Sequence, residues 1–177
     1  MMLLLLPLQA CTARSSNAQP PLDFRTALLQ SGGCAFDADL TLNYGDEAAQ
    51  FSLRCQADLA SGADLTVTAP DSISGLCAHV GTDGLTLTYD GAELGFPDLG
   101  RLTPLCAPWL LTDALAGGSR AWSGPEGETW RATYRSGYGR EELQIDVWFQ
   151  QNLPIRAEFT SDGELLLTAG IENFTFT

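Results

Sequence analysis

Apolar and polar residues alternate through most of the chain after residue 33, and this period of two constrains the fold more than any other feature. In the stretches CAFDADLTLNY (34–44) and QFSLRCQADLA (50–60) every second residue is apolar. Such alternation is typical of a strand with one buried and one solvated face. Gly45-Asp46-Glu47 between the two stretches is turn chemistry, so the sequence predicts a hairpin.

The same pattern predicts further strands, each followed by Gly, Pro, Asn or Asp at a turn. They span 63–69, 76–80, 85–89, 92–94, 119–122, 128–134, 141–149, 155–160 and 164–173. In the stretch 141–149 the alternation places Ile145 and Val147 on one face and Asp146 and Trp148 on the other. Trp148 is therefore predicted to face outward, where it could contact a partner or the membrane surface or pack against neighbouring side chains of that face.

Two segments have helical spacing instead. LDFRTALLQ (22–30) follows Pro20-Pro21 and predicts a short amphipathic helix. The segment 96–118 contains Pro97, Pro104 and Pro108 and ends at Gly117-Gly118. Because proline suits a helix start and interrupts a helix interior, we expect a broken helix or two short helices there.

About eight to eleven strands with two helical segments restrict the architecture. A sandwich of two sheets fits the alternation, and so does one large curved sheet. The helices have apolar faces that must be buried. We therefore predict a mostly β (α+β) fold, a single strongly curved antiparallel sheet that forms an unclosed half-barrel. The N-terminal helix and the helical insert would cover its concave face. A chain of 177 residues is one domain by length.

The N-terminal stretch MMLLLLPLQAC indicates the compartment. Its apolar run is too short to span a bilayer and fits a signal peptide over 1–10. No basic residue precedes the run, although a signal peptide normally has one. Either the true start lies upstream, or this is no export signal. Leu8-Gln9-Ala10-Cys11 resembles the bacterial lipobox, in which the cysteine thiol receives a diacylglycerol and the peptide is cut before it. A plain secretory signal is the alternative. We predict lipidation at Cys11, a flexible tether over 11–21 and the folded domain over 22–177.

Lipidation would hold the mature chain at the cell membrane, facing the extracytoplasmic side. In an oxidising compartment the remaining four cysteines predict up to two disulfides, with buried free thiols as the alternative. They are Cys34, Cys55, Cys77 and Cys106, and their spacing fits no metal motif. The net charge of −13 disfavours nucleic acid as a partner.

The order of helix, strands, helical insert and strands resembles the family of the periplasmic lipoprotein carrier and its outer-membrane receptor. Mycobacterial lipid-binding lipoproteins and clostridial germination lipoproteins share that fold. The resemblance covers 22–176, and APDSISGLCAHVGTDGLTLTYDGAEL (69–94) and LPIRAEFTSDGELLLTAGIENFTF (153–176) are its most specific parts. It implies an unclosed barrel that binds acyl chains, without catalytic residues. The soluble carrier of that family is not lipidated and uses a cavity arginine that has no clear counterpart here, so the resemblance favours membrane-anchored binding over transport.

Motifs that would indicate an enzyme are missing from the sequence, which has no HExxH, P-loop, dinucleotide-binding or G-x-S-x-G pattern. The one histidine, His79, lies in a predicted strand without a nucleophile elbow. We expect no catalytic residue, no cofactor and no metal. The other tryptophans, Trp109, Trp122 and Trp130, are interpreted as core residues or as the lining of a lipid cavity.

Our first hypothesis is a membrane-anchored, non-enzymatic lipoprotein that binds a lipid or acyl chain. The alternative is a lipoprotein that scaffolds or stabilises an envelope or spore-germination protein. The candidate hydrophobic cavity is lined by Phe36, Leu40, Phe51, Leu53, Leu87, Trp109, Leu110, Ile145 and Val147. Core packing without a ligand would use the same residues.

Overall fold

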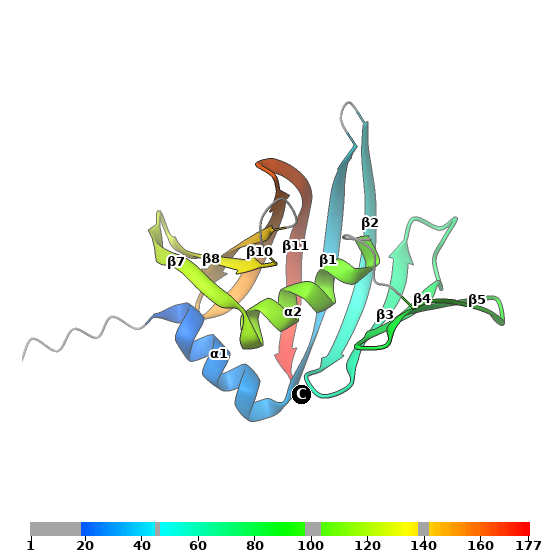
Figure 1. Ribbon diagram of the computed structural model, residues 1–177, viewed down its shortest axis with the longest axis horizontal. Coiled ribbons are helices and arrows are strands. Elements are labelled where there is room, and N and C mark those ends of the chain that lie inside the picture. Colours follow the sequence, from blue (N-terminus) through cyan, green and yellow to red (C-terminus); the bar gives the residue numbers. More distant parts are fainter. Residues whose placement is uncertain (1–18, 45–46, 98–103, 138–141) are drawn as a thin grey trace, which may run out of the picture.

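The computed structural model describes residues 19–44, 47–97, 104–137 and 142–177. The predicted signal peptide, Cys11 and most of the tether lie outside the described residues. The described chain forms one eleven-stranded antiparallel sheet that does not close, with helices on its concave face (Figure 1). The predicted fold class is confirmed. None of the described helices has the length and apolarity needed to cross a membrane.

The first half of the chain supplies six strands that follow one another as neighbours in the sheet. They are β1 (Gly33–Tyr44), β2 (Glu47–Asp58), β3 (Gly62–Ala69), β4 (Cys77–Gly81), β5 (Gly84–Tyr89) and β6 (Ala92–Phe96). Pairs such as Leu40 with Phe51 and Leu53 with Val67 place the apolar members of the alternation on one face. The predicted hairpin of the first two strands is therefore confirmed.

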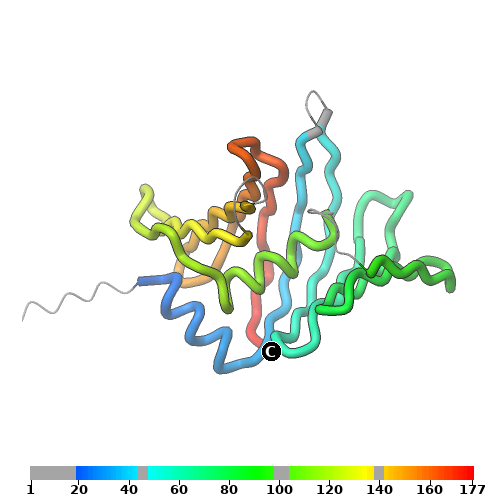
Figure 2. The backbone as a smooth tube through the Cα atoms, in the orientation of Figure 1, coloured from blue at the N-terminus to red at the C-terminus, as the bar shows by residue number. Residues whose placement is uncertain are grey.

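The second half supplies five strands in the same manner. They are β7 (Ser119–Glu126), β8 (Thr129–Ser136), β9 (Leu143–Gln150), β10 (Leu153–Ser161) and β11 (Glu164–Phe176). The alternation predicted for the β9 stretch is also found, because Ile145 and Val147 are buried. Figure 2 shows the backbone of the two halves as two wings that meet in the middle.

The strand order explains why a helix lies across the sheet. The order is β6-β5-β4-β3-β2-β1-β11-β10-β9-β8-β7, so the first and last strands pair at the centre and β6 and β7 lie at opposite edges. The chain must cross one face to connect those edges. It does so through a 3-10 turn, η1 (Pro104–Cys106), and helix α2 (Ala107–Gly117), which contacts β2, β3 and β8. The predicted helical insert is present as this 3-10 turn and the single helix that follows it directly, and residues 98–103 of the predicted segment lie outside the described residues.

The N-terminal helix α1 (Pro20–Ser31) covers the central strands beside α2. It begins two residues before the predicted start, because proline at the first helical positions needs no amide hydrogen bond. Phe24 and Leu28 are its buried apolar residues, and Phe24 lies against the rings of Phe149, Phe174 and Phe176. The core is therefore the layer between the sheet and the two helices.

β7 differs most from its prediction. β7 does not end at Trp122 but continues through Ser123-Gly124-Pro125 to Glu126, where a turn was expected. Proline is tolerated there because β7 is an edge strand and needs no outward hydrogen bond. A bulge between Arg120 and Trp122 shifts the register, so Trp122 pairs with Thr133 on the outer face and is exposed. The interpretation of Trp122 as a core or cavity residue is wrong.

Candidate hydrophobic ligand site

The apolar concave face continues beyond the helices onto the outer strands of the first wing. Cross-strand partners share a face of the sheet, so the pairings trace rows across β3, β4, β5 and β6. One row is Leu65–Ala78–Leu87–Leu94, and the next is Ala63–Val80–Leu85–Phe96. Both rows are apolar from end to end.

Exposure rises steadily along the first row. Leu65 is 1% exposed and Ala78 5%, Leu87 is half-buried, and Leu94 on the edge strand is 58% exposed. The second row ends on Phe96, which is 40% exposed, and Tyr89 at the hairpin end is exposed as well. We call Leu87, Tyr89, Leu94 and Phe96 the outer apolar surface.

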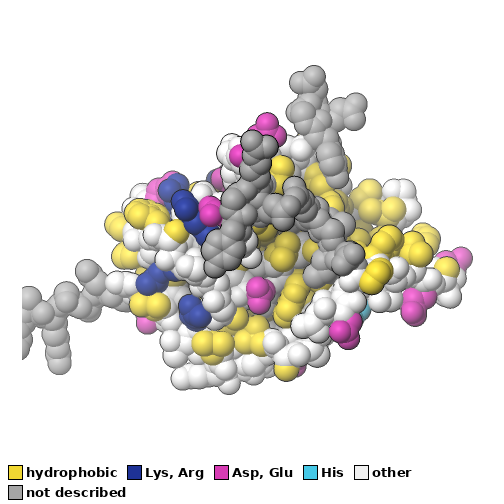
Figure 3. Space-filling view, viewed as in Figure 1, with side chains coloured by type: hydrophobic (Ala, Val, Ile, Leu, Met, Phe, Trp, Pro, Cys, Tyr) yellow, Lys and Arg dark blue, Asp and Glu magenta, His cyan; other side chains and the backbone are white. Residues whose placement is uncertain are grey.

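The helices leave this surface uncovered because of where α2 begins. Its main contacts with the first wing are to β2 and β3, and the main contacts of α1 with the sheet are to β1, β11 and β9. Figure 1 shows β4 and β5 extending past the start of α2, and Figure 3 shows hydrophobic side chains gathered at that end of the same face. An exposed apolar surface continuous with the core is typical of a binding site for a hydrophobic ligand or partner.

The nine predicted cavity residues divide into two groups. Five side chains are fully buried in the core, on β1, β2 and β9, and these are Phe36, Leu40, Leu53, Ile145 and Val147. The other four are half-buried at its margin, and these are Phe51, Leu87, Trp109 and Leu110. The half-buried group is the part accessible to a ligand. Leu94 and Tyr89 were missed because alternation gives no signal of exposure, and Phe96 was missed because it was assigned to the helical segment 96–118.

Cys34, Cys55 and Cys77 are free thiols that occupy both faces of the sheet, and Cys106 is buried in η1. Cys34 and Cys55 lie on the buried face of neighbouring strands, where Cys34 pairs with Ala57 and Phe36 pairs with Cys55. Cys77 is exposed on the outer face, so it cannot reach either of them. The predicted disulfides are therefore not confirmed.

We expect the four thiols to differ sharply in reactivity. Burial raises the pKa of Cys34 to about 11, against a smaller lowering by its contact with Thr112, and burial also raises the pKa of Cys55. Alkylation of the native protein at about pH 8 should therefore modify Cys77 rapidly and leave the three buried thiols unmodified until the chain unfolds. Peptide mapping that finds Cys34, Cys55 or Cys106 in a disulfide would contradict this.

The outer face of the second wing has a ladder of alternating aromatic and guanidinium groups. Arg131 lies over the rings of Trp122 and Trp148, with its guanidinium carbon 5.0 and 5.8 Å from their centroids. Arg156 lies 4.9 Å from the Trp148 ring. The predicted outward position of Trp148 is confirmed, and stacking between two arginines explains its limited exposure.

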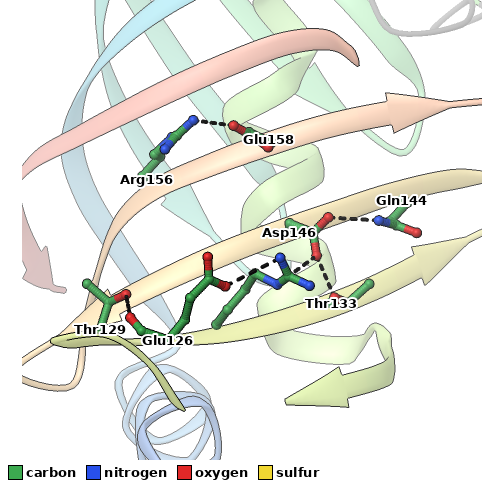
Figure 4. Close-up of polar contacts among 8 residues, drawn as sticks. Glu126, Thr129, Thr133, Gln144, Asp146, Arg156 and Glu158 are labelled. Atoms are coloured by element: carbon green, nitrogen blue, oxygen red, sulfur yellow. Dashed lines mark hydrogen bonds and ion pairs between the residues drawn. The ribbon is translucent and has the colours of Figure 1, made fainter. Parts of the chain in front are cut away.

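Carboxylates hold this ladder in place (Figure 4). Asp146, 8% exposed, accepts hydrogen bonds from Thr133 and Gln144 and lies 3.7 Å from Arg131 Nε. Glu126 pairs with Arg131, and Glu158 pairs with Arg156. Because these charged groups are paired with one another, the ladder is explained by packing of the outer face and needs no ligand.

His79 lies on the outer face of the first wing, on β4. Its Nδ1 is hydrogen-bonded to Asp64 at 2.7 Å. Its Nε2 lies 3.4 Å from the position that a Cβ would take at Gly81. Among the described residues no group of three histidine, cysteine or acidic side chains is placed to hold a metal.

Comparison with known proteins gives a likeness of fold alone. No family model matches the sequence, and no curated protein matches it. A LolA superfamily protein from Nitrosomonas europaea is similar in structure with a TM-score of 0.48 and 10% identity, over 90% of this chain and 93% of that one. The lipoprotein LppX of Mycobacterium tuberculosis has a TM-score of 0.42 and 13% identity, over 87% of this chain and 94% of that one. LprF of Mycobacterium bovis has a TM-score of 0.43 and 11% identity, over 90% of this chain and 94% of that one. The likeness to these structures is one of fold alone, and no residue role follows from it.

Proposed function

We propose that this chain is a non-enzymatic, membrane-anchored lipoprotein that binds a lipid or acyl chain along its concave face. The observation that supports the proposal is the apolar surface that runs without interruption from the core to the exposed edge of β6. An acyl chain on the outer apolar surface would remove Leu87, Leu94 and Phe96 from water, which is favourable by about 25 cal/mol per Å² of apolar area.

The half-buried residues at the start of α2 would form the second wall of this site. Trp109 and Leu110 pack against the core beside β2 and β3 and keep part of their apolar surface exposed. A ligand lying between these residues and Leu87 would contact apolar groups on two sides. The four half-buried residues of the predicted cavity, Phe51, Leu87, Trp109 and Leu110, belong to the proposed site.

The membrane anchor belongs to the proposal as well. Acylation of Cys11 would place the site on the extracytoplasmic side of the membrane, within reach of lipids, and two or more acyl chains give stable anchoring. Mass spectrometry of the protein purified from membranes should find Cys11 as the acylated first residue. An unmodified chain that retains residues 1–10 would contradict this.

Titration with a fluorescent fatty acid tests the binding site. Leu87→Asp should weaken binding by about 10- to 150-fold. The variant loses the free energy gained by burying one leucine side chain against the ligand, and it places a charge beside the acyl chain. Leu165→Asp, at an exposed leucine on β11, is the matched control and should bind as the unmodified protein does. Circular dichroism establishes that both variants are folded.

Two outcomes would oppose the proposal. Equal affinity in Leu87→Asp and the unmodified protein would place the ligand elsewhere. The absence of any fatty-acid binding, together with one constant protein partner recovered from the envelope, would favour the scaffolding function that the sequence left as the alternative.

A further inference from the structure

The two edges of the open sheet differ in how they are protected. An edge strand presents unpaired N–H and C=O groups to which another strand can add. β7 is protected by Pro125, by the bulge before Trp122 and by the charges of Arg120 and Glu126. β6 has no proline and no bulge, all five of its residues are exposed, and among the described residues no strand lies on its outer side.

Hairpin geometry identifies the backbone groups that point outward from β6. β5 and β6 are joined by the two-residue loop Asp90-Gly91, both with positive φ, and Tyr89 pairs with Ala92 at its end. The two residues that close a two-residue loop exchange two backbone N–H···O=C hydrogen bonds. Along the ladder, hydrogen-bonded pairs then alternate with non-hydrogen-bonded pairs. Ala92, Leu94 and Phe96 therefore bond to β5, and the N–H and C=O groups of the residues between them, 93 and 95, point to the free edge.

We propose that β6 pairs antiparallel with β6 of a second copy of this chain, with Leu94 at the two-fold axis. In this register Glu93 lies opposite Gly95 of the second copy, and their outward N–H and C=O groups bond to each other. Ala92 lies opposite Phe96 of the second copy, a small residue against a large one. The strand is thus complementary to itself, as an isologous interface requires.

Two other registers, each shifted from this one, would also let the outward-pointing N–H and C=O groups of the two β6 strands bond to each other. Both are less favourable. One places Glu93 opposite Glu93 of the second copy, and like charges directly opposite each other are destabilising. The other places Gly95 opposite Gly95 and Glu93 opposite Pro97, which has no N–H to donate. The register centred on Leu94 avoids both problems.

Pairing in this register keeps the concave faces of the two copies on the same side. The two-fold axis is perpendicular to an antiparallel sheet, so both Leu94 side chains lie on the concave face and contact each other across a non-hydrogen-bonded pair. Five residues per copy make a small interface, and we expect a reversible dimer.

Sedimentation equilibrium of the full chain in a non-ionic detergent tests the register through Gly95. This residue has no positive φ, and a Cβ there meets open space on the outer face, so a side chain is tolerated. Gly95→Glu places a carboxylate opposite Glu93 twice in each dimer and should raise the dissociation constant about 2- to 30-fold, while Gly95→Arg should lower it about 2- to 30-fold. The double variant Glu93→Arg with Gly95→Glu restores opposite charges and should dimerise like Gly95→Arg.

Gly117→Glu, the same change at another open glycine, is the control and should leave the dimer unchanged. A chain that stays monomeric at roughly millimolar concentration would overturn the proposal. So would a dimer that responds equally to Gly95→Glu and Gly95→Arg, or to neither. Because Gly95 lies on the outer face and the proposed ligand site on the concave face, fatty-acid binding by these variants reports separately on the proposed function.

Discussion

Phe24→Ala should destabilise the domain by about 3–5 kcal/mol, the range typical of deleting a buried phenylalanine ring. Phe24 is 1% exposed, and its ring lies 5.2–5.7 Å from those of Phe149, Phe174 and Phe176. These rings come from β9 and from the last residues of β11, so Phe24 helps to attach α1 to the sheet. The loss is measured by urea unfolding of the folded domain.

Leu29→Ala on the same helix is the control. Leu29 is 54% exposed, so its truncation should change the free energy of unfolding by no more than about 0.5 kcal/mol. If Phe24→Ala and Leu29→Ala had similar effects, α1 would not pack on the sheet in solution, and the concave face would be open at its centre.

Gly62→Ala should have the second large effect, because two penalties coincide at this position. Gly62 has φ +118°, and a Cβ there would lie 2.2 Å from the carbonyl oxygen of Val80 and 2.9 Å from Cα of Gly81. The backbone conformation alone costs roughly 1–3 kcal/mol for a residue with a side chain. The overlap with backbone atoms must also be relieved, so β3 and β4 should separate at this end. Amide hydrogen exchange would show lost protection at Val80.

Gly163→Ala separates the two penalties. Gly163 also has positive φ (+82°), yet a Cβ there meets no atom within 4 Å. Gly163→Ala should lower the free energy of unfolding only by the cost of a left-handed backbone conformation, about 1–2 kcal/mol. Equal destabilisation by the two variants would mean that the close approach of Gly62 to Val80 does not exist in solution.

The sheet could be predicted from the sequence because its signal is local. Alternation of apolar and polar residues marks each strand, and Gly, Asn and Asp mark the turns, so the strands and the half-barrel architecture were predicted correctly. β7 was predicted too short because Pro125 is a turn signal in most contexts. It is compatible with a strand only at a sheet edge, and edge position is a property of the whole topology.

The candidate site was only partly predictable for the same reason. Phe36 and Leu87 have the same pattern in the sequence, yet one is buried under the helices and the other lies at the margin of the exposed surface. The difference depends on how far α2 reaches across the sheet, which is fixed by the strand order. Trp122 was misplaced because a single bulge reverses the face to which the following residues point.

Native mass spectrometry of the protein purified from its own membranes tests the central claim most directly. If the concave face binds a lipid or acyl chain, the folded protein should carry a non-covalent adduct with the mass of a lipid, in addition to any covalent acylation at Cys11. Leu87→Asp should lose the adduct, and Leu165→Asp should keep it. A folded protein without an adduct in every preparation, and without affinity for added fatty acid, would contradict the account.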